Sequence, residues 1–480
     1  MNFETIIGIE IHCELKTNTK MFSGGRVSFN EAANTNVNEI DLGMPGTLPS
    51  LNKRGVQQTL KACHIFNMEI NPVLKFDRKC YFYPDLTKGY QITQNDYPIG
   101  TNGYIMLDLD DYEKRVNIDK VVIEEDTAKL SHFDDYTLID YNRCGNPLIE
   151  IISDASMRSA KEATTYINTL KNMLLFADIS DAKMEEGSLR CDINISLRPY
   201  GQEEFGVKTE IKNLNSISNI EKAISYEVDR QTKIILSNEK LTSETRRFDE
   251  TTKTTIMMRK KDDVIDYRFH QEPNILPTVL SAEFIEDVKK EIPLMPTELI
   301  DIYLNKYGLN IVDARILTSD FLIAQYYNEV IKYSDSYQTI ANWIISEILS
   351  YLNKNNLKIS EQYLTPKALA KMIELMNDGV VSSKHLKNIF EIVNETKNDD
   401  IEKIINEHNM MMISDEIKIL EFINQVLANN EKSVIDYQNG KDHAIKYLLG
   451  QIMKASKGQV NPKLTNDLLL KELENYRKGE

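Results

Sequence analysis

The chain has 480 residues, of which 41% are hydrophobic and 27% are charged, and its formal net charge is −16. This length predicts about two to four globular domains, and the charge argues against nonspecific coating of nucleic acid. The sequence has neither an apolar run of about 20 residues, which a membrane span requires, nor an N-terminal secretion signal. Its five scattered cysteines form no C-x-x-C motif, so we expect a soluble protein of a reducing compartment such as the cytoplasm.

Residues 9–15 form the first predicted strand. Apolar side chains at alternate positions are separated by Glu10, His12 and Glu14. A period of two places the apolar side chains on one face of the strand and the polar side chains on the other. The polar face could be a solvated surface, and His12 could be an ordinary surface histidine, unless neighbouring strands present similar groups.

The next informative segment is an apolar run at residues 121–126 that ends in Glu124, Glu125 and Asp126, as a buried strand entering a polar site would. Helical spacing of apolar residues then predicts a helix over residues 159–176.

Two further strands are predicted at residues 191–198 and 207–212, and a second helix follows at residues 216–236. The first of these strands alternates strictly and carries Asp192 on its polar face. The second aligns Lys208, Glu210 and Lys212.

Prolines between residues 273 and 296 predict a linker, and beyond it the apolar spacing becomes helical. The predicted helices cover residues 316–334, 336–353, 365–377, 382–391, 401–407 and the segment after 409. The fold class is therefore expected to be α+β, with a mixed or antiparallel sheet in a cradle-like catalytic domain. The expected domains are residues 1–292 (catalytic), 293–408 (all-α) and 409–480 (an all-α tail).

The polar strand faces together favour a metal and phosphate site. An acidic cluster on a sheet face costs free energy unless cations neutralise it. Oxygen-rich ligands with one imidazole suit Mg²⁺ or Mn²⁺ better than zinc. The sequence has no P-loop motif, no G-x-S-x-G motif and no cysteine paired with a plausible histidine, so nucleophilic hydrolysis by this chain alone is not expected.

The tail holds a local excess of positive charge in an otherwise acidic chain. Its lysines could contact RNA or form a solvated helix face. They are Lys441, Lys446, Lys454, Lys457 and Lys463, with Asp442 as the acid among them.

Several segments resemble the GatB family, the B subunits of bacterial aspartyl/glutamyl-tRNA amidotransferase. The resemblance covers nearly the whole chain, in order and with little insertion. The segments are residues 8–17, 76–85, 184–199, 212–216, 244–250 and 450–458.

This resemblance implies membership of a heterotrimer. In the family, the amidase-like A subunit releases ammonia from glutamine and a small C subunit wraps the pair. The B subunit uses ATP and Mg²⁺ to phosphorylate the side-chain carboxylate of misacylated Asp-tRNA(Asn) or Glu-tRNA(Gln), and ammonia then displaces the phosphate to leave the amide. The helical tail of the family contacts the tRNA, which implies such a role for the tail lysines of this chain.

Matching the family residue by residue assigns roles to the polar strand faces. The implied metal ligands are Glu10, His12, Glu125, Asp192 and Glu210. The implied phosphate contacts are Arg190, Lys208, Lys212 and Arg246.

The chain also departs from the family pattern. Many relatives bind structural zinc through two cysteine pairs, where this sequence has Ser23, Gly25, Asn38 and Asp41, so no zinc is expected. Val122, Thr127-Ala128 and residues 267–273 also differ from the usual family residues.

Two alternatives remain open from the sequence. The chain could be a paralogue that activates a carboxylate on another carrier, or a nonenzymatic RNA-binding scaffold. The archaeal-type E subunit has an inserted domain for which this chain has no room. Which tRNA is served, and the path of ammonia, are not encoded in recognisable motifs.

Overall fold

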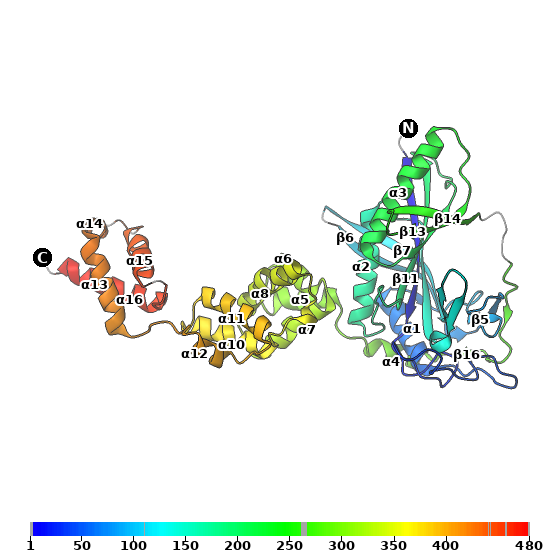
Figure 1. The fold of residues 1–480 in the computed structure, drawn as a ribbon, viewed down its shortest axis with the longest axis horizontal. Coiled ribbons are helices and arrows are strands. Elements are labelled where there is room, and N and C mark those ends of the chain that lie inside the picture. Colours follow the sequence, from blue (N-terminus) through cyan, green and yellow to red (C-terminus); the bar gives the residue numbers. More distant parts are fainter. Residues whose placement is uncertain are drawn as a thin grey trace. The chain divides into compact units, whose positions relative to one another are not determined.

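The computed structural model describes residues 3–109, 111–260, 266–439, 441, 443–456 and 458–478. The chain divides into two compact units, Met1–Pro296 and Thr297–Glu480. The first unit is built on a mixed sheet and the second is helical (Figure 1), which confirms the predicted α+β class followed by all-α structure. The division into three domains at residues 292 and 408 stays a prediction.

A nine-stranded sheet organises the first unit, with strand order β14-β13-β12-β11-β1-β10-β7-β6-β2. The central strand β1 (Phe3–Glu14) pairs antiparallel with β10 (Pro147–Ser153) and β11 (Leu189–Pro199). The pair β12–β13 is parallel, which makes the sheet mixed. The outer strands are β7 (Tyr112–Glu125), β6 (Gly100–Leu109), β2 (Glu69–Ile70), β12 (Thr209–Leu214), β13 (Glu244–Asp249) and β14 (Thr254–Lys260).

Helices cover the apolar face of this sheet. Helix α1 (Lys53–Ile65) packs on β2, β6 and β7, helix α2 (Ala160–Phe176) on β6, and helix α3 (Ile217–Leu236) on β11, β12 and β14. The core between the layers includes Ile9, Ile11 and Ile193, all almost completely buried. Each fully buried isoleucine contributes about 1.5–3 kcal/mol. Strand alternation then turns the even-numbered residues of β1 toward the opposite face.

Small sheets and a short helix complete the first unit. One sheet joins β15 (His270–Gln271), β4 (Asp77–Cys80) and β5 (Tyr90–Thr93), and β5 contacts β7. The other sheets are the pair β3 (Val73–Leu74) with β16 (Thr278–Val279) and the hairpin β8 (Lys129–His132) with β9 (Thr137–Asp140). A 3₁₀ turn, η1, spans Tyr141–Arg143.

The predicted helices of the first unit begin and end close to their predicted bounds, because Ser159 and Ser216 cap α2 and α3. The predicted linker between residues 273 and 296 is wrong in one respect, since it contains helix α4 (Ala282–Lys290). Ser281 caps this helix, and Val288 is buried in the core.

The second unit contains short helices. The prediction of one helix over residues 316–334 is wrong, because α6 ends at Thr318 and Asp320 caps the start of α7. Helices α8 and α9 continue into one another through a π-helical turn at Ile344–Ile348. The helices are α5 (Pro296–Asn305), α6 (Ile311–Thr318), α7 (Phe321–Val330), α8 (Tyr337–Trp343), α9 (Leu349–Asn355), α10 (Pro366–Asn377), α11 (Ser383–Thr396), α12 (Ile401–Glu407), α13 (Glu416–Asn429), α14 (Glu431–Gln438), α15 (His443–Ala455) and α16 (Pro462–Lys478), with a 3₁₀ turn at Ile359–Glu361.

None of the helices in the described ranges is both long enough and apolar enough to cross a membrane.

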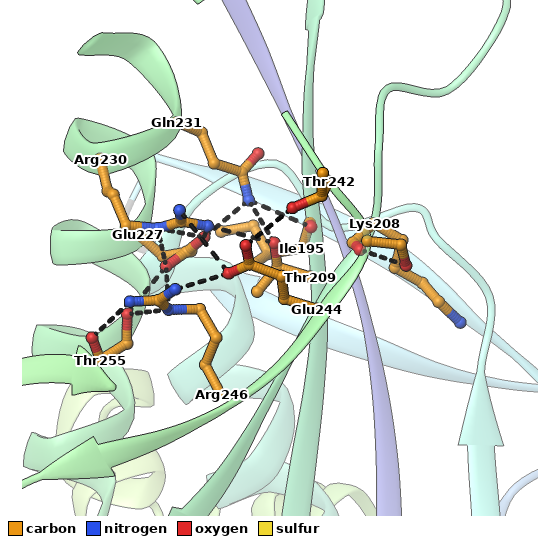
Figure 2. A network of polar contacts seen from close by, with 11 residues as sticks. Ile195, Lys208, Thr209, Glu227, Arg230, Gln231, Thr242, Glu244, Arg246 and Thr255 are labelled. Atoms are coloured by element: carbon orange, nitrogen blue, oxygen red, sulfur yellow. Dashed lines mark hydrogen bonds and ion pairs between the residues drawn. The ribbon is translucent and has the colours of Figure 1, made fainter. Parts of the chain in front are cut away.

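A buried polar network ties α3 to the β13–β14 end of the sheet (Figure 2). Glu227 is fully buried and accepts hydrogen bonds from Arg230 at 2.6 Å, Gln231 at 2.9 Å and Thr255 at 3.0 Å. Arg246 donates to the Thr255 hydroxyl at 2.8 Å and to its carbonyl oxygen at 2.7 Å. Arg246 therefore belongs to the structural support of the sheet.

Replacing Glu227 with alanine should destabilise the first unit by about 3–5 kcal/mol, because Arg230 would lose its closest carboxylate and Gln231 and Thr255 would lose a buried hydrogen-bond acceptor. Calorimetric unfolding of the full chain measures this loss. The matched control is Glu221→Ala on the exposed side of the same helix, which should change stability by less than about 0.5 kcal/mol. Equal stability of the two variants would contradict a supporting role for the network.

Candidate metal centre

The polar side chains of β1 meet those of the neighbouring strands on one face of the sheet. The register pairs His12 with Glu150 on β10. It pairs Glu10 with Asp192 on β11. Register partners in a sheet point to the same side, so residues distant in sequence converge there.

The tightest part of this face surrounds His12. Its Nε2 atom lies 3.8 Å from Glu10 Oε1 and 3.9 Å from Glu150 Oε1. A third carboxylate oxygen, Glu124 Oε2, lies at 4.0 Å. Glu10, His12 and Glu150 each offer a ligand atom, and these atoms lie within 4.8 Å of one another. One ion could bridge them.

Two of the three carboxyl groups around His12, those of Glu10 and Glu150, share one proton. Burial and the charges of Glu124 and Glu10 raise the pKa of Glu150 to about 9. Burial opposes ionisation of Glu10, yet a hydrogen bond from Glu150 and the positive charges nearby lower the pKa of its carboxyl group. A divalent cation would replace the shared proton, and three carboxylates with one imidazole suit Mg²⁺ or Mn²⁺. These residues therefore fit the expected metal.

Asp192 and Glu210 form the adjoining part of the face, with Lys212 between them. Lys212 Nζ forms an ion pair with Asp192 and lies 3.4 Å from Glu210 Oε1. Burial opposes the charge of Lys212, but both carboxylates raise the pKa of its ammonium group. A register shift of β12 near Asn213, whose φ is +63°, accompanies this arrangement. The structure thus brings together five of the implied site residues, namely Glu10, His12, Asp192, Glu210 and Lys212.

The structure does not bring Glu125 to His12. Its carboxylate accepts hydrogen bonds from Lys88 Nζ at 2.6 Å and from the backbone N–H of Ile92 at 3.0 Å. Glu124 takes the position near His12 because it follows Val122 by two residues, and Val122 pairs with Glu150. The role of Glu125 as a metal ligand stays a prediction.

The sequence reasoning missed Lys79 as well as Glu124 and Glu150. Lys79 lies on β4, and its Nζ is 5.1 Å from the centroid of the Tyr267 ring. Burial opposes its charge, but the carboxylates of Glu124, Glu150 and Glu10 raise the pKa of Lys79. This ammonium is therefore a fixed positive charge beside the cluster. Lys79 lies inside the family-like segment 76–85, which could have indicated a role in the site. Glu150 lies outside the strands predicted to form the site, and its segment shows no alternation of polar and apolar residues.

Arg190 lies next to the cluster but already has a strong partner. Its Nη2 donates to Asp126 Oδ2 at 2.8 Å, while Arg143 Nε lies 3.4 Å from the same oxygen. Arg190 Nε is buried without a hydrogen-bond partner among the described residues. Arg190 can therefore still offer one N–H group to an anion. Burial and the charge of Asp126 raise the pKa of the neighbouring Glu14 to about 8.

The other implied phosphate contacts lie elsewhere. Arg246 is held in the network of α3 described above, on the apolar side of the sheet (Figure 2). Lys208 is exposed ahead of β12, and in the same view its side chain points away from that network. The structure therefore does not bring Arg246 to the carboxylate cluster, because its neighbour Arg247 occupies the register position beside Lys212. Contacts of Arg246 and Lys208 with phosphate stay predictions.

The residues that stand where many relatives have zinc-binding cysteines lie around the buried ammonium group of Lys20. Lys20 is fully buried, and its Nζ lies 3.3 Å from Asp41 Oδ2. Ser23 Oγ donates to the same oxygen at 2.9 Å. A side-chain carbon at Gly25 would come within 3.0–3.1 Å of Lys20, Asn38 and Asp41. These four positions supply one carboxylate and no thiolate, so they do not fit a structural zinc.

The tail lysines lie on or near α15. Lys446 and Lys454 are exposed on this helix, separated by eight positions and so about 80° apart around its axis. Lys441 lies 2.8 Å from Asp436 in an ion pair. Lys457 lies outside the described residues. The predicted RNA contact of this segment stays a prediction.

The chain is similar to known proteins over nearly its whole length. Family models match the chain twice, the GatB/GatE catalytic domain over residues 5–286 and the GatB domain over residues 325–473. A protein of Oceanobacillus iheyensis, named as the B subunit of aspartyl/glutamyl-tRNA(Asn/Gln) amidotransferase, is 48% identical over 476 residues, which are 99% of this chain and 100% of that protein. The chain belongs to the GatB/GatE family.

Further members of this family match equally broadly. Proteins of the same name from Mesoplasma florum and Staphylococcus aureus are 47% identical to the chain over 478 and 474 residues. Each match covers 99% of this chain, and 99% and 100% of those proteins respectively. The whole carboxylate cluster falls within the GatB/GatE catalytic-domain match, and Lys446 and Lys454 fall within the GatB-domain match.

Divalent cations should stabilise the chain, by about 2.7 kcal/mol at a concentration 100 times the dissociation constant. The stabilisation should grow as the pH rises from 6 toward 9, because metal binding displaces the proton that Glu150 holds below a pKa of about 9. Thermal unfolding with and without Mn²⁺ or Mg²⁺ measures it. Glu150→Gln should reduce the effect, whereas the exposed control Glu204→Gln should keep it. An undiminished effect in Glu150→Gln would contradict the assigned centre.

Proposed function

We propose that the chain is the B subunit of a tRNA-dependent amidotransferase. It would use ATP and Mg²⁺ to phosphorylate the side-chain carboxylate of misacylated Asp-tRNA(Asn), Glu-tRNA(Gln) or both, which ammonia then converts to the amide. The observation that carries this proposal is the cluster of Glu10, His12, Glu124 and Glu150, on the sheet face of a chain that belongs to the GatB/GatE family. Work on aminoacyl-tRNA would take place in the cytoplasm.

The chemistry requires activation of a poor acyl donor. Transfer of the γ-phosphoryl group to a carboxylate oxygen breaks the bond between that group and ADP and gives an acyl phosphate. The nitrogen of ammonia then attacks the carbonyl carbon, phosphate departs, and the nitrogen loses a proton. When bound, Mg²⁺ supplies neutralisation of phosphate charge.

Named residues of the chain support each requirement. Glu10, His12 and Glu150, with Glu124 beside His12, would hold the metal, while Lys79 and Lys212 would add positive charge beside the transferred phosphoryl group. Lys212 would turn from its carboxylate partners Asp192 and Glu210 toward phosphate oxygens, and those two carboxylates could then help to hold a divalent cation. Such positioning of fixed charges supplies most of the catalysis in phosphoryl transfer.

Nitrogen would come from partner proteins. Burial raises the pKa of Cys13 and Cys63 to about 12 and that of Cys144 to about 11, which suppresses their nucleophilic thiolate forms. Cys80 Sγ lies 3.9 Å from His270 Nδ1, so the expectation that no cysteine is paired with a histidine is wrong at this position. An amidase-like A subunit would release ammonia from glutamine, and a small C subunit would complete the complex.

Glu124→Gln should lower the rate of ATP-dependent amidation of misacylated tRNA by more than roughly 100-fold. Loss of a residue that only supports a metal ligand typically costs about 10- to 100-fold, and loss of a ligand should cost more. The assay uses the assembled complex with ammonium chloride in place of glutamine, so that ammonia release is not measured. Raising Mg²⁺ should partly restore Glu124→Gln, because a weakened site fills at higher concentration.

Glu125→Gln provides the comparison, since it leaves Lys88 without its buried counterion. Its loss of activity should not respond to Mg²⁺ if Glu125 acts only through Lys88, and should respond if Glu125 is a ligand. Full activity of Glu124→Gln would favour the nonenzymatic scaffold.

The tail should bind the body of the tRNA through phosphate contacts. Reversing the charge of Lys446 and Lys454 should therefore weaken tRNA binding and flatten its salt dependence by about one unit of log affinity per log salt for each lost contact. Binding across a salt series measures both, and ATP binding should stay normal. Lys367→Glu, an exposed lysine on α10, is the control. An unchanged salt slope would show that these lysines form only a solvated face.

A further inference from the structure

A row of basic side chains extends from the carboxylate cluster to the edge of the sheet. Lys212 on β12 is the register partner of Arg247 on the parallel strand β13. On β14, Arg259 is the partner of Thr245, whose hydroxyl donates to Glu210 at 2.8 Å. Register partners share a face and alternate residues of a strand do too, so Lys212, Arg247 and Arg259 lie on the face of the cluster.

These outer arginines are free to bind a ligand. The Arg247 side chain is 47% exposed, and the nearest carboxylate oxygen in an ion pair with it, Asp249 Oδ2, is 3.9 Å away. Arg259 is exposed and has no ion pair with a described residue. Arg246 is the contrast, since only 12% of its side chain is exposed and Glu244 and Thr255 use its donors. The chain thus keeps two adjacent arginines for different purposes.

The length and chemistry of the row identify its ligand. Neighbouring strands lie about 4.8 Å apart, so the row from β12 to β14 spans about 10 Å and starts where the reacting carboxylate would lie. Ile256, the register partner of Arg247, and Met258 expose 38% and 57% of their surface along the same edge strand. A positively charged row that follows the phosphate backbone is the sequence-independent part of a single-stranded nucleic-acid site, and the aliphatic side chains beside it add apolar contact area. Because the net charge of the chain is −16, the chain as a whole repels a polyanion, and attraction is confined to the surroundings of this row.

We propose that Lys212, Arg247 and Arg259 form a track for the phosphates of the single-stranded 3′ end of the substrate tRNA. This inference rests on the proposed function and adds the route by which the aminoacyl group reaches Glu10 and Asp192. Arg247 and Arg259 act as positioning residues, because phosphate contacts fix the register of an RNA strand without reading its bases.

The test compares Arg247→Ala and Arg259→Ala with Lys260→Ala in the complex with its partner proteins. Lys260 is adjacent in sequence and equally basic, but it is the register partner of Glu244 and so lies on the opposite face. Each arginine variant should raise KM for misacylated tRNA roughly tenfold, as expected for one charge-assisted contact. At saturating tRNA, kcat should stay near normal, as should KM for ATP. Lys260→Ala should match the wild type in every constant.

Binding to trimmed tRNA separates this track from other contacts. Wild type and Arg247→Ala should differ in affinity for intact tRNA, and should bind equally to tRNA from which the 3′ single strand has been removed. The slope of log affinity against log salt should fall by about 0.7 per lost contact, but only for intact tRNA. Arg247→Lys, which keeps the charge, should recover most of the affinity and guards against a folding defect.

Several results would overturn the track. An arginine variant that raises KM for ATP with unchanged tRNA binding would assign the row to the nucleotide. A loss of affinity that persists with trimmed tRNA would place the contact elsewhere on the RNA. Wild-type complex that amidates tRNA while both arginine variants equal Lys260→Ala would reject the track but keep the proposed function. Wild-type complex that neither binds nor amidates any tRNA would reject the function itself.

Discussion

The antiparallel pairing of β1 with β10 and β11 is the constraint on which the site depends. It sets Glu10 opposite Asp192 and His12 opposite Glu150, although these partners are separated by more than a hundred residues of sequence. The same pairing buries Ile9 and Ile11 under the helices. A slip of one residue would exchange the two faces and put carboxylates into the apolar core, so burial of the isoleucines enforces the geometry of the site.

Charge compensation is distributed over separate strands. Three carboxylates around the centre have cations supplied by other elements, with Lys88 for Glu125, Lys212 for Asp192 and Arg190 for Asp126. A buried ion that loses its partner costs several kcal/mol, which ties the positions of these strands together. Substrate and metal binding would then act by exchanging partners within a set of charges that the fold already holds.

Much of this arrangement follows from the sequence, because alternation and helical spacing are local properties. The period of two predicted the site faces of β1, β11 and β12, and the helical spacing of apolar residues predicted α2 and α3. Which face of the sheet a residue at the end of a strand points to depends on pairing with the neighbouring strand. The sequence Glu124-Glu125 therefore did not show which of the two acids faces His12. The same difficulty separates Arg246 from Arg247. Lys79 was missed because only the tertiary fold lays β4 across the cluster.

The parallel pairing of β12 with β13 has a consequence for folding. Parallel neighbours cannot be joined by a hairpin, so the chain crosses over through the 20 residues of α3 before β13 can add to the sheet. Without the docked helix, β13 and β14 would be an isolated two-stranded hairpin, which is at best marginally stable in water. We therefore expect the border of the sheet beyond β12 to form after its middle and to open before it, so that the amide hydrogens of β14 exchange with solvent sooner than those of β1.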